Sequence, residues 1–581
     1  MKYTLLTCVP VLFTQITAHI VPGEHSAYLN PIDRRQTASC ENTATSRDCW
    51  GNYSINTNYY DVTPDTGVIR EYWLTAVNTT LAPDGYERQV LTWNGTYPGP
   101  LIEADWGDTL LVHVTNGLEN NGTSIHWHGI RQGNTSESDG VPGVTQCPIS
   151  PGNTMTYKFR CTQYGHSWYH SHFTLQYADG LLGPLIIHGP TTANWDVDLG
   201  TLLLSDWSHT SAFILWDNSA SKGAPPQLEN GLINGTNTYN CTGSTDSACL
   251  GNGTRFETTF TSGTKYLIRL VNTAIDGYIR FAIDGHSFSV ISNDFVAIEP
   301  YTTDNLLIGI GQRYEIVVEA DQDVDNYWLR AIWQTTCIGN DNADNILGIV
   351  RYDGASTTSD PTTTVGNFNN SCGDELLSDL VPYLNLTVGA FATEEELDLA
   401  FSIANSLFTW TINTTSLLLD WADPTELRIL NNDPIFPTDY NVHEITVVDQ
   451  WVYWVIQDTS GIGITHPIHL HGHDFFVLAQ ETGSFDASTT TLNLDNPPRR
   501  DVASLPGNGF LVLAFYTDNP GSWLMHCHIS WHQSQGLALQ FVERESEIAA
   551  TITDPDTFNS TCKAWSSFYA TGKYIEDDSG I

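Results

Sequence analysis

The chain is poor in basic residues. Its 581 residues include 23 Lys and Arg against 66 Asp and Glu, which gives a formal net charge of −43. A field of that sign repels polyanions, so nucleic acid and anionic membrane surfaces are excluded as partners. The pI is about 4.4, which has two interpretations: an acidic working environment, or charge that serves only solubility.

Long apolar runs are missing after the N-terminus. The one near the start covers residues 3 to about 18, is too short for a membrane span of ~20 residues, and is typical of a secretory signal. We predict a signal peptide over residues 1–18 and a pro-peptide over 19–35 that ends at the dibasic Arg34-Arg35. A dozen Asn-x-Ser/Thr sequons support secretion and glycosylation: Asn52, Asn78, Asn94, Asn121, Asn134, Asn234, Asn240, Asn252, Asn369, Asn385, Asn413 and Asn559.

Cysteine is sparse. Of the 11 cysteines, Cys8 leaves with the signal peptide and Cys527 lies between two histidines as a candidate metal ligand. The others are odd in number, which in an oxidising compartment leaves one thiol unpaired. We expect Cys161, on a half-buried strand, to be that inert thiol. Four disulfides are predicted: Cys40–Cys49, Cys241–Cys249, Cys337–Cys372 and Cys147–Cys562.

Helical periodicity is scarce, and the one short helix that we predict covers Glu394 to Ala400. Elsewhere, short runs rich in Val, Ile, Thr, Tyr and Trp alternate with Gly, Asn, Asp and Pro turns. This pattern predicts an all-β fold of sandwiches or barrels.

A degenerate repeat divides the chain. Three stretches each read as a strand, a polar turn and a second strand that ends in or near histidine: 110–128, 266–286 and 451–473. A partner strand follows in each unit, at 165–172, 325–331 and 521–528. We therefore predict three similar β-domains over residues 36–190, 191–365 and 366–581, with the Ser/Thr-rich stretch 355–365 as the second linker.

Ten histidines fall in four tight clusters: His126 and His128; His170 and His172; His466, His469 and His471; and His526, His528 and His532. Residues i and i+2 of a strand point to the same face, so each H-x-H pair directs two imidazoles into one space. A lone pair is weak evidence, because core or surface histidines are common. Four such pairs favour a metal site.

The cysteine inside the last cluster indicates which metal. A thiolate among histidines favours copper. Cys527 points away from His526 and His528, so one strand reaches two metal centres on opposite faces. Zinc could bind some of these ligands. A zinc site would have no use, however, for the covalent path that Cys527 and its neighbours make between two metal centres.

These clusters resemble the four copper-binding signatures of the multicopper oxidases, and most closely those of the ascomycete laccases. HWHG, HSH, HPIHLHGHDF, NPPRRDV, HCHISWH and the Asp-Ser-Gly-Ile ending carry the resemblance, which extends along nearly the whole mature chain. It implies three cupredoxin-like domains, of the Greek-key β-sandwich or barrel type, and four copper ions: one type 1, one type 2 and two type 3.

The resemblance also implies the ligands. The type 1 copper takes His466, Cys527 and His532, and the type 2 copper takes His126 and His469. One type 3 copper takes His128, His170 and His528, and the other takes His172, His471 and His526. Asp139, in the stretch SDGVPG, matches a family acid thought to help proton delivery to oxygen; its alternative interpretation is an ordinary turn residue.

Two further positions follow from the resemblance. Leu537 occupies the axial position of the type 1 copper, where leucine cannot coordinate, so the potential should be raised. No nearby methionine replaces it, because the only ones are Met1, Met155 and Met525. This argues against the Met-ligated ascorbate and bilirubin oxidases. The C-terminal residues 577–581 resemble a tail that plugs the solvent channel, with disorder as the alternative.

The implied function is that of a secreted, monomeric laccase, which removes single electrons from phenols and reduces O₂ to water. A phenol would dock at the edge of His532 and lose its proton to a nearby acid, for which Glu257 and Asp246 are the candidates. A metallo-oxidase of Fe(II) is the alternative, and scarce methionine opposes a Cu(I) oxidase. A blue copper carrier would leave eight histidines without a purpose. The physiological phenol stays open.

Overall fold

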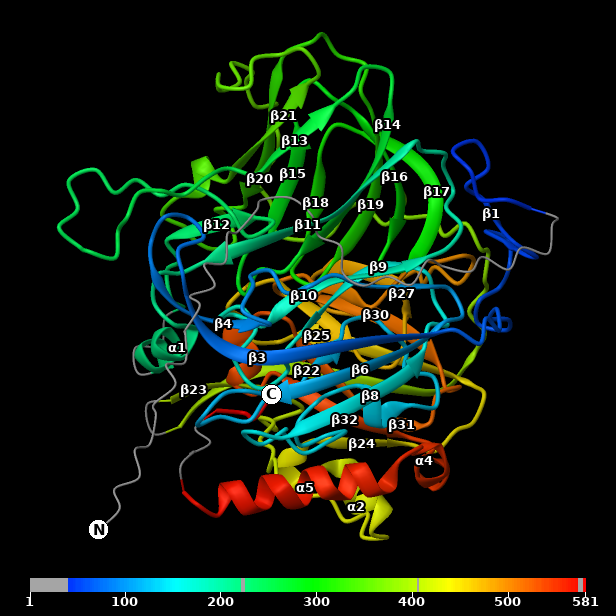
Figure 1. Ribbon diagram of the computed structural model, residues 1–581. Helices are drawn as coiled ribbons and strands as arrows, with labels where there is room; N and C mark the ends of the chain where they lie inside the picture. The colour runs from blue at the N-terminus through cyan, green and yellow to red at the C-terminus, as the bar shows by residue number, and fades with distance from the viewer. Residues whose placement is uncertain (1–39, 221–224, 405–406, 573–577) are drawn as a thin grey trace, which may run out of the picture.

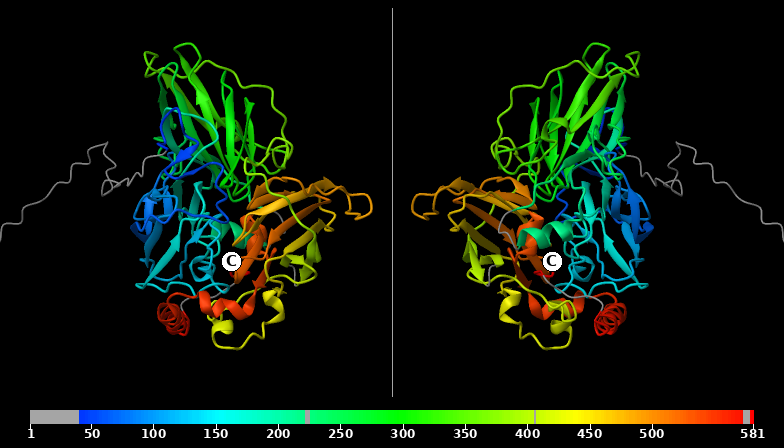
Figure 2. Two further views of the ribbon diagram at one scale, coloured as in Figure 1. Left: turned by 90° about the vertical axis from the view of Figure 1, so that its right-hand side faces the viewer. Right: turned by 90° about the vertical axis from the view of Figure 1, so that its left-hand side faces the viewer.

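The computed structural model describes residues 40–220, 225–404, 407–572 and 578–581. The predicted signal peptide and pro-peptide, residues 1–35, lie outside the described residues. Three β-rich lobes pack around a common centre, with the green lobe above the blue and orange lobes (Figures 1 and 2). No helix within the described ranges is long and apolar enough to cross a membrane.

Each lobe pairs two sheets. The first lobe has two four-stranded sheets. One has the strand order β4 (Arg88–Trp93), β3 (Ile69–Leu81), β6 (Thr109–Asn116) and β8 (Thr154–Arg160). The other has the order β5 (Ile102–Asp105), β10 (Leu182–His188), β9 (Gly165–His170) and β7 (His126–Trp127). The second lobe has a six-stranded sheet and a five-stranded sheet. The first has the strand order β12 (Asn230–Ile233), β11 (Val197–Trp207), β14 (Lys265–Asn272), β19 (Arg313–Glu319), β16 (Phe288–Asn293) and β17 (Val296–Thr303). The other has the order β13 (Glu257–Phe260), β21 (Leu347–Tyr352), β20 (Asn326–Trp333), β15 (Ile279–Ile283) and β18 (Leu306–Ile308).

The third lobe repeats this plan. Its sheets are β23 (Leu407–Ile412), β22 (Phe391–Ala404), β25 (Trp451–Asp458), β30 (Gly509–Tyr516), β27 (Phe475–Thr482) and β28 (Arg499–Arg500), and β24 (Val442–Ile445), β32 (Ala538–Glu543), β31 (Gly521–Cys527), β26 (His466–Leu470) and β29 (Val502–Leu505). The smaller elements are β1 (Cys49–Trp50), β2 (Tyr53–Ser54), α1 (Ala212–Ala220), α2 (Thr425–Leu430), α3 (Ser530–Ser534), α4 (Glu545–Thr551), α5 (Pro555–Tyr569), η1 (Ser136–Ser138), η2 (Ala343–Asn345) and η3 (Thr438–Tyr440).

The topology confirms the internal repeat. The parallel pair β3–β6 of the first lobe corresponds to β11–β14 in the second and β22–β25 in the third. The predicted partner strands also pair as expected, because β7–β9, β15–β20 and β26–β31 are all antiparallel neighbours. The all-β fold of three similar units is therefore confirmed, while the exact domain limits stay predictions.

The predicted helix over Glu394–Ala400 is wrong, because this segment lies within strand β22. Its glutamates favour a helix in isolation, but Leu397 and Leu399 are buried while Glu396 and Asp398 are exposed. This period of two fits a sheet, and the strand pairs in parallel with β25. Tertiary packing therefore overrides the local propensity.

The cysteine predictions are confirmed. All four predicted disulfides form, and the free cysteines of the described residues are Cys161 and Cys527, both buried. Burial raises the pKa of the Cys161 thiol, which keeps it protonated and unreactive. The Cys147–Cys562 bridge fastens α5 to the first lobe at the bottom of the molecule (Figure 1).

Candidate metal centres

The first candidate centre consists of one thiol and two imidazoles. Cys527 on β31 and His466 on β26 lie on neighbouring antiparallel strands, and His532 lies on α3, directly after β31. Cys527 Sγ is 3.6 Å from Nδ1 of each histidine, and the two Nδ1 atoms are 3.1 Å apart. Two nitrogens and one sulfur therefore converge on one point, which is the donor set of a blue copper site.

The ionisation states of this group suit a cation. Burial lowers the pKa of His466 to about 4 and that of His532 well below its usual value, so both rings are neutral and keep a lone pair. Burial also raises the pKa of the Cys527 thiol, so a neighbouring cation is what would ionise it. The Trp410 ring packs 4.8 and 4.7 Å from the two imidazoles and holds them in place.

Leu537 lies next to Cys527. Its side chain is fully buried in the same apolar core as Cys527, and its carbonyl oxygen accepts the N–H of Cys527 at 3.1 Å. Leucine offers no lone pair, so it adds no donor to His466, Cys527 and His532. The residue type at this position excludes a thioether bond.

The second candidate centre consists of eight imidazoles from both the first and the third lobe: His126, His128, His170, His172, His469, His471, His526 and His528. All eight are at most 2% exposed. On the antiparallel pairs, His126 stands directly opposite His170, and His469 stands opposite His526. The H-x-H spacing on paired strands is therefore what gathers these rings at the contact between two lobes.

The structure gathers the residues of the three sets that the resemblance implies in one cluster, in which rings of different sets also lie close, such as those of His126 and His471 with centroids 4.0 Å apart. His126 Nε2 and His469 Nε2 are 3.5 Å apart. Ring nitrogens of His172, His471 and His526 lie within 4.8 Å of one another. The rings of the third set have centroids 5.1 to 5.8 Å apart: His128, His170 and His528.

Hydrogen bonds outside the cluster fix how several rings point. Nδ1 of His126 and Nδ1 of His469 donate to the main-chain oxygens of Asp139 and Asp501, both at 2.8 Å. Nδ1 of His471 contacts Asp139 Oδ2 at 2.8 Å. Such contacts fix the tautomer and turn the other ring nitrogen towards the cluster.

The nitrogens that face the cluster test whether a metal fits. Nε2 of His170, His471 and His526, and both ring nitrogens of His172, are buried without a hydrogen-bond partner among the described residues. Burial and the neighbouring imidazoles lower the pKa of His172 and His471 far below the usual value, so these rings are neutral. Buried, neutral and unpaired imidazoles are ligands that suit copper.

Two supporting residues are not predicted from the sequence. Asp501 Oδ1 lies 3.2 Å from His128 Nε2, and neither ring nitrogen of His128 has a hydrogen-bond partner among the described residues. Both Asp501 oxygens accept hydrogen bonds from Arg313 of β19, so the second lobe contacts this centre without supplying a histidine. Asp501 belongs to the NPPRRDV motif, and that motif is the signal by which it could have been found.

The two candidate substrate acids lie in contacts of their own. Glu257 forms an ion pair with Arg351 at 2.7 Å, and Asp246 accepts a hydrogen bond from Tyr86 at 2.7 Å. Among the described residues neither acid has a hydrogen bond or ion pair with His532. The structure thus gathers the predicted ligands and Asp139, and it does not bring these two acids into contact with them.

The last residues of the chain fold back into the protein. Ser579 N–H and Oγ–H donate to the main-chain oxygens of Ser534 and Gln533 beside α3, and Trp421 Nε1–H donates to the oxygen of Gly580. Ile581 is fully buried among side chains that include Val141, two residues after Asp139. The described end of the tail is therefore ordered rather than loose.

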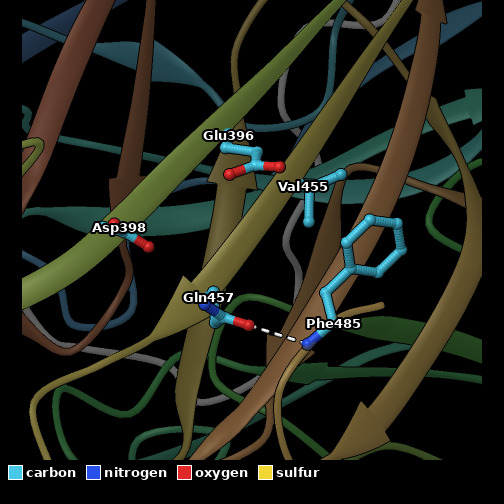
Figure 3. Close-up of a pocket in the computed structure, with 5 residues that line it drawn as sticks. All are labelled: Glu396, Asp398, Val455, Gln457 and Phe485. Carbon is cyan, nitrogen blue, oxygen red and sulfur yellow. Dashed lines mark hydrogen bonds between the residues drawn. The ribbon is translucent and has the colours of Figure 1, made fainter. Parts of the chain in front are cut away.

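A small surface pocket lies apart from both centres (Figure 3). Glu396 and Asp398 of β22 face Val455 and Gln457 of β25, and Phe485 N–H donates to Gln457 Oε1 at 2.7 Å. A larger cleft of about 220 Å³ is lined by Arg131, Trp451, Tyr516 and their neighbours. Neither is lined by a candidate ligand.

Comparison with known proteins agrees with this geometry. Three family models, each described as multicopper oxidase, match residues 75–192, 198–355 and 408–547. The chain is 58% identical to Laccase-2 of Botryotinia fuckeliana, with both chains covered in full. A crystal structure of the laccase from Botrytis aclada superposes with a TM-score of 0.91 at 58% identity, over 94% of this chain and 100% of that one.

A more distant structure belongs to a multicopper oxidase that functions in iron import. It is 29% identical, with a TM-score of 0.76, over 86% of this chain and 95% of that one. Full-length relatives at high identity and three matching family models agree with the two histidine centres. The chain therefore belongs to the multicopper oxidase family.

Proposed function

We propose that the chain is a laccase that oxidises phenols by single electrons at His532 and reduces O₂ to water at the eight-histidine centre. The observation that carries this proposal is the position of Cys527. Its side chain belongs to the first centre, while its chain neighbours His526 and His528 belong to the second. One strand thus joins an electron-accepting site to a site for O₂.

The proposed cofactor is four copper ions. His466, Cys527 and His532 would hold the type 1 copper, and His126 and His469 the type 2 copper. His128, His170 and His528 would hold one type 3 copper, and His172, His471 and His526 the other. Bound copper supplies one-electron redox chemistry at the first centre and four-electron reduction of O₂ at the second. The buried unpaired nitrogens support this assignment.

The proposed reaction balances over four phenols. Each phenol loses one electron and one proton and becomes a phenoxyl radical. One O₂ takes up the four electrons and four protons and becomes two waters. The phenol is proposed to dock at His532, which is the half-buried ring of its pair, whereas His466 is fully buried. Glu257 or Asp246 as the acceptor of the phenol proton stays a prediction.

The side chains around the centres have proposed roles of their own. Asp139 contacts His471 and His126, so it would orient both rings and exchange protons with the site of O₂ reduction. Leu537 would leave the type 1 copper without an axial donor, which raises its potential. Buried Ile581 supports the tail as a plug.

The proposed location is extracellular, and the proposed oligomeric state is a monomer. All twelve sequon asparagines lie in the described ranges, and each is exposed or half-exposed, so glycans would meet no buried site. The signal peptide that would direct export lies outside the described residues.

Oxygen uptake tests the proposal. The copper-loaded protein is given 2,6-dimethoxyphenol or Fe(II), each with and without catalase. Rapid uptake with the phenol that catalase does not change supports a laccase, because no peroxide is released. Uptake with Fe(II) and none with the phenol would replace the laccase by the metallo-oxidase alternative, which the iron-import relative represents.

A further inference from the structure

A group of buried polar side chains lies beside Asp139, outside both ligand sets. Its members come from η1, α2 and β31: Ser136, Glu137, Glu426 and Ser522. Glu137 is 7% exposed and the other three are 0% exposed. Five oxygens of Asp139 and this group have no hydrogen-bond partner among the described residues: Ser136 Oγ, Glu137 Oε2, Asp139 Oδ1, Glu426 Oε2 and Ser522 Oγ. Buried oxygens of this kind normally face bound water.

Main-chain hydrogen bonds hold Glu426 at this place. Its N–H donates to the Val144 oxygen at 3.0 Å, and Thr425 N–H donates to the Gly143 oxygen at 3.2 Å. Both acceptors belong to the loop that follows Asp139. On the other side, Ser522 N–H of β31 points at Glu426 Oε1 at 3.5 Å. The first turn of α2 is therefore fixed against the Asp139 loop and the strand of Cys527.

Glu137 links the group to the surface. Its Oε1 accepts hydrogen bonds from Thr553 N–H at 3.0 Å and from Thr553 Oγ1 at 2.8 Å. Thr553 lies between α4 and α5, at the bottom of the molecule (Figure 1), and the next residue, Asp554, is exposed. The second oxygen of Glu137 is buried and unpaired. The Glu137 carboxyl group therefore has one oxygen at the protein surface, on Thr553, and one oxygen in the buried polar group.

Asp139 is the inner end of the group. Its Oδ2 contacts His471 Nδ1 at 2.8 Å. Its Oδ1 lies 3.2 Å from His126 Nδ1, but that nitrogen donates to the main-chain oxygen of Asp139, so Oδ1 is left without a donor. Oδ1 is therefore free to accept a hydrogen bond from bound water.

The charges around Glu426 favour its protonated form. Burial raises the pKa of Glu426 well above its usual value, and the carboxyl groups of Glu137 and Asp139 raise it further. The Ser136 side chain and Ser522 N–H act in the opposite direction. No basic side chain in the described part of the chain forms an ion pair with Glu426 or Glu137, so an ionised pair would be costly here.

We propose that Glu137 and Glu426, together with bound water, form the route by which protons from solvent reach Asp139 and the site of O₂ reduction. Glu426 is the residue that stores the proton between the surface and Asp139. This inference rests on the proposed function. Each O₂ consumes four protons and four electrons, and the four phenols are proposed to release their protons at His532, which has no hydrogen bond or ion pair with these acids among the described residues.

The route makes the second half of the reaction dependent on two acids that touch neither substrate nor ligand. They act through Asp139 and its water, so they are relay residues. Reduction by phenol needs no proton from them and proceeds unchanged in their absence. Return of the reduced protein to the oxidised state by O₂ slows instead. Measuring reduction by phenol and reoxidation by O₂ separately therefore distinguishes a relay role from a general structural role.

The test uses the full-length, copper-loaded protein. Wild type, Glu426→Gln, Glu137→Gln and Glu426→Asp are compared with Asp439→Asn, which changes an exposed acid of the same lobe. Glutamine at position 137 keeps an oxygen for the Thr553 hydrogen bonds, so this variant folds even if the change at Glu426 does not. Each protein is reduced anaerobically by phenol and then mixed with O₂ across a pH series.

The expected result is reoxidation about tenfold slower or more in Glu426→Gln, as for loss of a proton donor. In wild type, the reoxidation rate should fall as pH rises through the pKa of Glu426. In Glu426→Gln this pH dependence should be absent. Glu137→Gln slows in the same direction, Glu426→Asp recovers part of the rate, and Asp439→Asn matches wild type. Reduction by phenol is equal in all five proteins. Infrared spectra show a protonated carboxyl band that Glu426→Gln lacks.

Three outcomes would overturn the relay. Equal reoxidation of wild type and both glutamine variants would mean that protons arrive elsewhere. A carboxyl band that survives Glu426→Gln would place the stored proton on another residue. A stoichiometric cation other than copper, present in wild type and lost in Glu426→Gln, would make the group a cation site. Wild type that is not reoxidised by O₂ would instead contradict the proposed function itself.

Discussion

Arg313 of the second lobe donates two hydrogen bonds to Asp501 of the third, at 2.5 and 2.6 Å, in a contact where both side chains are at most 1% exposed. Asp501 in turn lies against His128 and His469. The lobe that lacks the histidine clusters therefore supports the ligand centre by a buried ion pair.

Removal of Arg313 should destabilise the whole molecule. Arg313→Met leaves the Asp501 charge buried and unpaired, for which the expected cost is about 3–5 kcal/mol. We expect a lower Tm in calorimetry and a lower copper content at the eight-histidine centre, since Asp501 would move. Arg351→Met breaks a pair with exposed Glu257 and is the control. Equal effects of the two variants would contradict the supporting role of Arg313.

Leu537→Met should lower the potential of the first centre. Methionine fills nearly the same volume, so the packing cost is below about 1.5 kcal/mol. Its thioether would give the copper the axial donor that leucine lacks, which stabilises Cu(II). Redox titration of the blue absorption band measures the shift. A potential that stays unchanged, with the blue band intact, would show that the axial position does not control it.

Glu315 should stabilise the folded protein above about pH 4.5 and contribute less in stronger acid. Burial alone would raise its pKa, but the hydrogen bond with His166 and the charge of Arg269 hold it at about 2. A folded pKa below the usual 4.5 contributes stability above pH 4.5 that is lost as pH falls towards 2. Glu315→Gln should therefore lower the Tm at pH 6 and have a shrinking effect below pH 4.5. A deficit that is constant from pH 6 to pH 2 would exclude this linkage.

The Cys147–Cys562 bridge should hold α5 against the first lobe. The bridged residues pack with Phe173, Trp421 and Trp565 in one apolar cluster. Replacement of both cysteines by serine is expected to cost about 2–5 kcal/mol. Protease cleavage near α5 should become faster while phenol oxidation at low temperature is retained. Unchanged cleavage and an unchanged Tm would show that the apolar cluster alone holds α5.

Sequence spacing predicts which ligands point together because it acts locally. Two residues on one strand face must point the same way, so the spacing alone assigns His526 and His528 to one site and Cys527 to another. The short disulfide loops, such as Cys241–Cys249, follow from spacing as well. Spacing carries no information on contacts between lobes, which is why it does not predict the roles of Arg313 and Glu426.

The wrong helix prediction and the untested choice of substrate acid have separate physical causes. The segment from Glu394 to Ala400 forms part of a strand because its alternating leucines are buried against a sheet that the local sequence does not reveal. Glu257 and Asp246 are candidates by their residue type alone, in a loop-rich region. The structure gives each of them another partner, Arg351 and Tyr86, and no contact with His532 among the described residues.

The central claim is that Cys527 connects two copper centres, and Cys527→Ser tests it most directly. Copper analysis and electron paramagnetic resonance of the purified variant are the measurement, with wild type alongside. We predict loss of one copper of four, loss of the blue band and of phenol oxidation, and retention of the signal from the eight-histidine centre. A variant that keeps the blue band and phenol oxidation, or that loses all copper at once, would contradict the account.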